Sequence, residues 1–163
     1  MRFRDDNGLL AVVGHRNAAW LTALGLHALH TRGHAGCGLA VSDGSGIRAI
    51  RGSGPTEEVF HGAAMDGLRG AVALGQVYGH PNPGMPDTLF VGTDLRPVIG
   101  RYRGGALAVA LSGRLTNGSQ LRRELTERGR LFHGHTDAEL IAHLIADSGK
   151  GTFVNRVVDA LWQ

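Results

Sequence analysis

The chain has 163 residues, which suits one domain, and its 42% hydrophobic and 19% charged residues are typical of a folded protein. It contains no apolar run of about 18 residues and its first residues lack the apolar core of a signal peptide, so we expect no membrane insertion and a cytoplasmic location. The net charge of +3 is scattered without an aromatic-interleaved basic stripe, which argues against nucleic-acid binding.

The first half of the chain alternates short apolar runs with turn residues. The sequence predicts strands over 9–13, 38–42, 47–51 and 70–77, a helix over 18–31 with Asn17 as its N-cap, and a short helix over 55–60. Prolines make the stretch 79–87 irregular in this prediction.

The second half is mostly helical by the same criteria. A core strand is predicted over 106–111, and helices are predicted over 119–128, 137–147 and 153–162. Thr136 and Glu139 have the spacing of a capping box at the start of the second of these helices. With no internal repeat, linker or charge block, residues 1–163 are expected to form a single domain.

Four blocks, in the same order, resemble the class II glutamine amidotransferase family, and most of all its amidophosphoribosyltransferase branch. They are residues 7–34, the Arg-Gly-His segment with the strand and turn after it (32–44), residues 105–117, and residues 131–140. The resemblance implies an α/β (α+β) fold of the N-terminal-nucleophile hydrolase type. This fold is an αββα sandwich with antiparallel sheets, here shortened at its C-terminal end.

The resemblance also implies that the catalytic nucleophile is replaced. In the family, an N-terminal cysteine attacks the side-chain amide of glutamine and its own α-amine acts as the base. The matching position here is Asn7, which follows six other residues. A carboxamide is not a nucleophile of this kind, because its nitrogen lone pair is delocalised.

Other positions of the family's glutamine pocket differ as well. Tyr78 stands where the resemblance places the arginine that binds the substrate α-carboxylate, and Ser112 stands where it places an oxyanion-stabilising asparagine, beside Gly113. Asp137 matches the residue that binds the substrate α-amine, although a carboxylate at a helix N-terminus also has a structural role. We expect a vestigial ligand pocket made by a set of residues from several blocks: Arg32, His34, Tyr78, His80, His135 and Asp137.

These replacements lead to the hypothesis of a catalytically inactive amidotransferase-like protein that serves as a binding, scaffolding or regulatory subunit. The C-terminal strands of the resembled domain are absent after Gln163. We therefore expect a protein partner or a homo-oligomer to complete the fold, unless the shortened fold closes on itself. A small-molecule ligand in the vestigial pocket is expected too, but no cofactor, and phosphoribosyl transfer is not expected from a chain of this length.

Three alternatives remain open. Cys37, the only cysteine, would act as a replacement nucleophile if His34 lay beside it. A second alternative is a metal site formed by converging histidines and a carboxylate: His34, His80, His133, His135 and Asp137. The third is a glutamine amidotransferase that works with a nucleophile from a partner chain.

Overall fold

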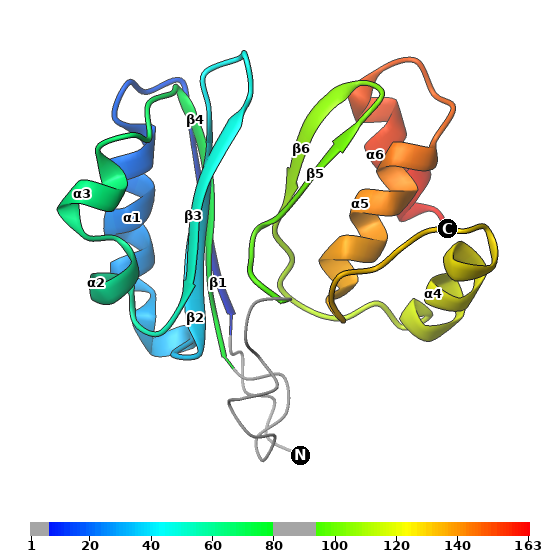
Figure 1. Ribbon diagram of the computed structural model, residues 1–163, viewed down its shortest axis with the longest axis horizontal. Coiled ribbons are helices and arrows are strands. Elements are labelled where there is room, and N and C mark those ends of the chain that lie inside the picture. The colour runs from blue at the N-terminus through cyan, green and yellow to red at the C-terminus, as the bar shows by residue number, and fades with distance from the viewer. Residues whose placement is uncertain (1–6, 80–93) are drawn as a thin grey trace.

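The computed structural model describes residues 7–79 and 94–163. Figure 1 shows four layers, with helices on both outer sides and two β-sheets facing each other between them. One sheet and its helices come from the N-terminal half of the chain, and the other pair of layers comes from the C-terminal half. The αββα order of layers is therefore the one that the sequence predicts.

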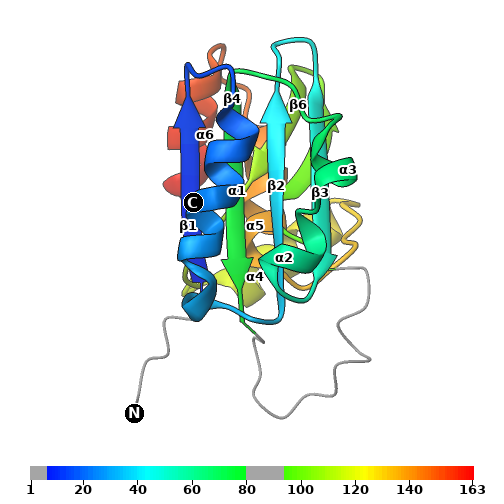
Figure 2. The ribbon, with the colours of Figure 1, turned by 90° about the vertical axis from the view of Figure 1, so that its left-hand side faces the viewer.

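The N-terminal half builds a four-stranded antiparallel sheet in the order β1-β4-β2-β3. Its strands are β1 (Asn7–Val13), β2 (Gly36–Ser42), β3 (Ile47–Ser53) and β4 (Val72–Tyr78). Four helical segments follow or separate them: α1 (Ala18–Ala28), the 3₁₀ turn η1 (His30–Arg32), α2 (Thr56–Val59) and α3 (Gly62–Met65). In Figure 2, α1, α2 and α3 all cover the same outer face of this sheet.

The C-terminal half pairs a two-stranded ribbon with three helices. The ribbon consists of β5 (Val98–Tyr102) and β6 (Gly105–Val109), and the helices are α4 (Gly118–Glu127), α5 (Asp137–Asp147) and α6 (Phe153–Leu161). Helix α5 packs against the ribbon, α4 and α6, and its apolar residues Leu140, Ile141, Leu144 and Ile145 are buried at helical spacing. A hydrophobic core therefore forms between β6 and the three helices of this half.

Close packing of α1 on the first sheet depends on small residues. Ala18, Ala19 and Ala23 are buried against the strands, and a β-carbon at Gly75 of β4 would run into the side chains of Leu26 and Thr22. The helix therefore lies near the sheet backbone, and Leu26 and Leu39 are completely buried between the two.

Several predicted details of the first half are wrong. The first helix ends at Ala28 and is followed by a separate 3₁₀ turn, and β4 begins at Val72 rather than at residue 70. Asn17 makes no side-chain cap, because its backbone (φ −102°, ψ 29°) is not in the extended conformation that capping requires. Residues 80–87 of the expected irregular stretch lie outside the described residues.

The second half also departs from prediction in two places. Strand β5 was not predicted, and Thr136 makes no side-chain cap hydrogen bond. The Glu139 carboxylate accepts hydrogen bonds from two other backbone N–H groups, so the capping box does not form. No helix within residues 7–79 and 94–163 is long and apolar enough to cross a bilayer.

Candidate functional site

Strand pairing brings two of the predicted site positions together. Asn7 at the start of β1 pairs with Tyr78 at the end of β4, and Tyr78 also pairs with Gly36 at the start of β2. A β-carbon at Gly36 would overlap the Tyr78 hydroxyl, so the phenol ring lies across that strand end. The two positions that the resemblance assigns to the nucleophile and to the arginine are therefore neighbours at one end of the sheet.

The Asn7 side chain takes part in a buried polar network. Its Oδ1 accepts hydrogen bonds from Gln76 Nε2 at 3.2 Å and from Arg96 Nη1 at 3.3 Å. Gln76 is fully buried and its Nε2 also donates to the carbonyl oxygen of Leu111 at 2.8 Å. The network thus links the former nucleophile position in the first sheet to the residue before Ser112, in the other half of the sandwich.

The guanidinium group of Arg96 lies next to Tyr78, where the resemblance places an arginine. Its guanidinium carbon lies 4.9 Å from the centroid of the Tyr78 ring, which is the geometry of a cation–π contact. Burial raises the pKa of Tyr78, and the nearby charge of Arg96 opposes that rise. Burial lowers the pKa of Arg96, against the opposing influence of Tyr78, Asp94 and Asp137.

Two atoms of this network are buried without a hydrogen-bond partner among the described residues. They are Arg96 Nε, a donor, and Gln76 Oε1, an acceptor. Buried polar atoms are usually paired, because each one left unpaired costs free energy. Arg96 Nε thus retains an unused donor, and Gln76 Oε1 retains an unused acceptor, among the described residues.

Asp137 is engaged with the turn that carries the former oxyanion residues. Its Oδ2 accepts a hydrogen bond from the backbone N–H of Leu115 at 2.8 Å. Gly113, in the same turn, has φ +117°, a conformation that L-residues rarely adopt. Ser112 is exposed and makes no hydrogen bond within the described ranges 7–79 and 94–163. The Asp137 carboxylate thus has a structural partner at the position that the resemblance gives to substrate binding.

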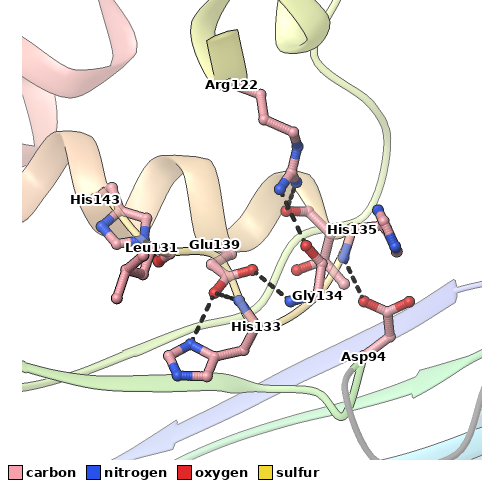
Figure 3. Close-up of polar contacts among 9 residues, drawn as sticks. Asp94, Arg122, Leu131, His133, Gly134, His135, Glu139 and His143 are labelled. Atoms are coloured by element: carbon pink, nitrogen blue, oxygen red, sulfur yellow. Dashed lines mark hydrogen bonds and ion pairs between the residues drawn. The ribbon is translucent and has the colours of Figure 1, made fainter. Parts of the chain in front are cut away.

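Side chains hold the loop before α5 through hydrogen bonds to its backbone, as Figure 3 shows. Glu139 accepts hydrogen bonds from the N–H groups of His133 at 2.8 Å and Gly134 at 3.1 Å, and Arg122 donates to the Gly134 carbonyl at 3.0 Å. Asp94 accepts from the N–H of His135 at 2.7 Å. The rings of His133 and His135 point apart, so these two imidazoles do not converge on a metal ion.

Two further residues of the predicted pocket lie in or just after the 3₁₀ turn η1. Arg32 lies in η1 and His34 just after it, where the His34 ring packs edge-on against His30 with centroids 6.3 Å apart. His80 lies outside the described residues. No cluster of three or more metal-binding side chains exists within residues 7–79 and 94–163, so the described part of the chain does not support the metal alternative.

The structure also argues against Cys37 as a nucleophile. Cys37 is only 1% exposed, and its thiol faces the Gly54 carbonyl oxygen at 3.8 Å. Burial, together with the nearby charge of Glu57, raises its pKa to about 12. The thiol is therefore protonated at neutral pH, whereas nucleophilic cysteines need the thiolate.

Comparisons with known proteins agree with this architecture. Residues 91–159 match a family model described as a glutamine amidotransferase domain. The amidophosphoribosyltransferase of Lacticaseibacillus casei is 36% identical over 142 residues, which cover 86% of this chain and 71% of that protein. The chain belongs to the amidophosphoribosyltransferase family of class II glutamine amidotransferases. Its α/β fold of the N-terminal-nucleophile hydrolase type, predicted from the sequence, is thereby confirmed.

Other members of the family are much longer than this chain. The chloroplastic amidophosphoribosyltransferase 3 of Arabidopsis thaliana is 34% identical over 160 residues, covering 98% of this chain and 29% of that protein. A solved structure of glutamine phosphoribosylpyrophosphate amidotransferase from Bacillus subtilis, complexed with ADP and GMP, superposes with a TM-score of 0.83 at 31% identity. The match covers 94% of this chain and 32% of the solved chain, so the chain described here spans about a third of the length of these relatives.

Sequence reasoning missed the residues that connect this site. Gln76 lies two residues before Tyr78 in the sequence, but its role depends on contacts across the two halves. Arg96 and Asp94 carried no signal, because they lie outside every block of the resemblance.

Proposed function

We propose that this domain does not hydrolyse glutamine and acts as a binding or regulatory subunit. The observation that carries the proposal is the Asn7 carboxamide, whose oxygen accepts hydrogen bonds from Gln76 and Arg96 at the position of the family's nucleophile. A carboxamide does not form the covalent thioester-type intermediate that a cysteine thiolate forms. Loss of one oxyanion donor, as at Ser112, costs roughly 100- to 1000-fold in rate even when a nucleophile is present.

Ammonia release from glutamine tests the inactive part of the proposal. The purified chain should release no more ammonia than its Asn7→Ala variant. The positive control is a chain that starts at position 7 and carries Asn7→Cys, Tyr78→Arg and Ser112→Asn. Turnover of the unaltered chain above that of Asn7→Ala would overturn the proposal and favour a nucleophile from this site or from a partner chain.

The apolar surface of α6 supports the subunit part of the proposal. Four large apolar residues of α6 and its C-cap Trp162 are about half exposed or more; the four are Phe153, Val154, Val158 and Leu161. Exposed apolar patches of this kind commonly mark protein contacts. We infer that a second polypeptide or a second copy of the chain packs on α6.

Native mass spectrometry of the chain isolated from its own source tests this contact. A defined complex that Val158→Glu dissociates would support it. Leu131→Glu is the matched control, because Leu131 is 81% exposed and lies in the loop between α4 and α5. A monomer in all three samples would overturn the subunit part of the proposal.

Two buried atoms without a partner among the described residues, Arg96 Nε and Gln76 Oε1, support a ligand at the vestigial pocket. Glutamine, which carries a carboxylate, an amine and an amide, is the natural first probe. It should raise the melting temperature of the unaltered chain, and Arg96→Gln should remove this effect. The absence of any shift with the unaltered chain would contradict ligand binding here.

A further inference from the structure

A second recess lies at the opposite end of the sandwich from the vestigial pocket. There, the turn between β2 and β3 faces the turn between β5 and β6, at the upper end of both sheets in Figure 1. At this end of the first sheet, Ser42 of β2 pairs with Val72 of β4. Gly36 and Tyr78 pair at the opposite end of the same two strands, beside the vestigial pocket. The two turns line a cleft of about 370 Å³, within the range of roughly 300–1,000 Å³ typical of small-molecule sites.

Glycines leave the backbone of this cleft open. Gly44 and Gly46 come from the first turn and Gly105 from the second, and a β-carbon added at any of them would meet no atom within 4 Å. Gly44 and Gly105 also have positive φ angles of +91° and +127°, which favour glycine. The floor of the cleft is therefore unobstructed, so a ligand can approach the main chain closely.

Three arginines gather beside this floor. A smaller recess of about 130 Å³ shares Gly46 and Arg101 with the cleft and is lined in addition by Arg48 and Arg69. These side chains come from β3, from the segment before β4 and from β5, so the fold converges them from separate parts of the sequence. The three arginines are therefore close in space although they are far apart in the sequence.

The charges of this group are only partly balanced. Asp43 pairs with Arg48 at 3.5 Å, and hydrogen bonds from the Ser45 hydroxyl and N–H hold its pKa below the usual value, so it stays ionised at neutral pH. Arg69 and Arg101 make no ion pair or hydrogen bond to any residue that the structure describes. Two positive charges thus remain beside an open cleft.

We propose that this cleft binds the phosphate group of a small phosphorylated ligand, held by Arg69 and Arg101. Guanidinium groups bind phosphate oxygens through paired N–H donors, and two of them match the double negative charge of a phosphate monoester. The rest of the ligand lies over the glycine turns. This binding function is separate from the proposed inactivity at Asn7 and does not depend on it.

Titration calorimetry at low ionic strength tests the site with two probes, inorganic phosphate and glucose 6-phosphate. Both should bind saturably. Arg69→Gln combined with Arg101→Gln should weaken binding about tenfold or more, because both charged donors are lost. Arg123→Gln combined with Arg128→Gln removes the same charge from exposed positions at α4 and should leave binding unchanged.

The open glycine floor allows a second, independent test. At Gly46 an added β-carbon would meet no atom within 4 Å, so Gly46→Ala should retain binding, whereas Gly46→Asp adds a negative charge at the cleft and should abolish binding of both probes. Tighter binding of glucose 6-phosphate than of phosphate would show that the cleft holds more than the phosphate, and equal binding would limit recognition to the phosphate group. Absence of saturable binding, or equal losses in the two arginine pairs, would overturn the proposal.

Discussion

The carbonyl oxygen of Arg96 lies directly against the α-carbon of Gly38, so that a β-carbon at position 38 would overlap it. This contact lets the segment that enters β5 approach the middle of β2. Arg51 reinforces the approach by donating from Nη1 to the Pro97 carbonyl oxygen at 3.3 Å. The absence of a side chain at Gly38 therefore determines where the Arg96 guanidinium reaches, and with it the hydrogen bond to Asn7.

Gly38→Ala should therefore destabilise the protein and disturb the candidate site. Overpacking against a backbone atom typically costs about 1–3 kcal/mol, since the main chain must move to relieve it. Urea denaturation followed by circular dichroism measures this loss. Gly100→Ala in β5 is the control, because its β-carbon would meet no atom within 4 Å, and it should change stability by less than about 1 kcal/mol. Equal stability of the two variants would contradict the close approach.

Asp137→Ala should destabilise the turn that contains Ser112 and Gly113. The variant loses the 2.8 Å hydrogen bond from the Leu115 N–H to the carboxylate, and a bond to a charged group contributes about 1.5–3 kcal/mol. Chemical denaturation gives the free energy of unfolding, and amide exchange at Leu115 should accelerate. Asp66→Ala is the control, since Asp66 is exposed and its carboxylate has no hydrogen bond among the described residues. If both variants lost the same stability, the structural role of Asp137 would be wrong.

The resemblance could locate parts of this site but could not connect them. Asn7 and Tyr78 were identified because the resemblance places a cysteine and an arginine of the family at these positions, and strand pairing makes them neighbours. Arg96 was not identifiable, because it is 89 residues from Asn7 in sequence and reaches it only across the packed layers. Contacts of this kind depend on the distance between layers, which no local pattern of residues reports.

The same contrast holds for the secondary structure. The helix predicted over 137–147 is α5 residue for residue, because its apolar residues repeat at helical spacing over three turns. Strand β5 was missed because its apolar run is only Val98 and Ile99, which Gly100 and Arg101 end. The strand forms because it pairs with β6, and not because of a strand pattern in its own sequence. Tertiary context therefore determines this element.

Glu139→Ala should loosen the loop before α5. The Glu139 carboxylate is 8% exposed and accepts the backbone N–H groups of His133 and Gly134, so its removal leaves two donors without a partner. We expect a loss of about 2–4 kcal/mol in the free energy of unfolding. Hydrogen exchange at both amides should accelerate. Glu127→Ala, at an exposed end of α4, should change neither quantity, and unaltered exchange in Glu139→Ala would exclude the loop-anchoring role.

Cys37 should react with iodoacetamide only when the protein unfolds. The side chain is almost fully buried, and the raised pKa keeps the thiol protonated near neutral pH. The rate of alkylation at pH 8 should therefore rise with added urea in parallel with the unfolded fraction. Alkylation of the native protein as fast as that of a free thiol would restore the nucleophile alternative.

The same thiol predicts how stability depends on pH in the alkaline range. The pKa of a cysteine in an unfolded chain is 9.0, and burial raises the pKa of Cys37 in the folded protein to about 12, so the protonated thiol favours folding. The contribution of Cys37 is fully present below pH 9.0 and is lost as pH rises toward 12, reaching roughly 4 kcal/mol across a shift of that size. Denaturation midpoints of the unaltered protein and of Cys37→Ala, measured at several alkaline pH values, isolate this contribution. The unaltered protein should lose stability more steeply above pH 9.0, since alanine cannot ionise, and parallel curves would mean that the buried thiol does not resist ionisation.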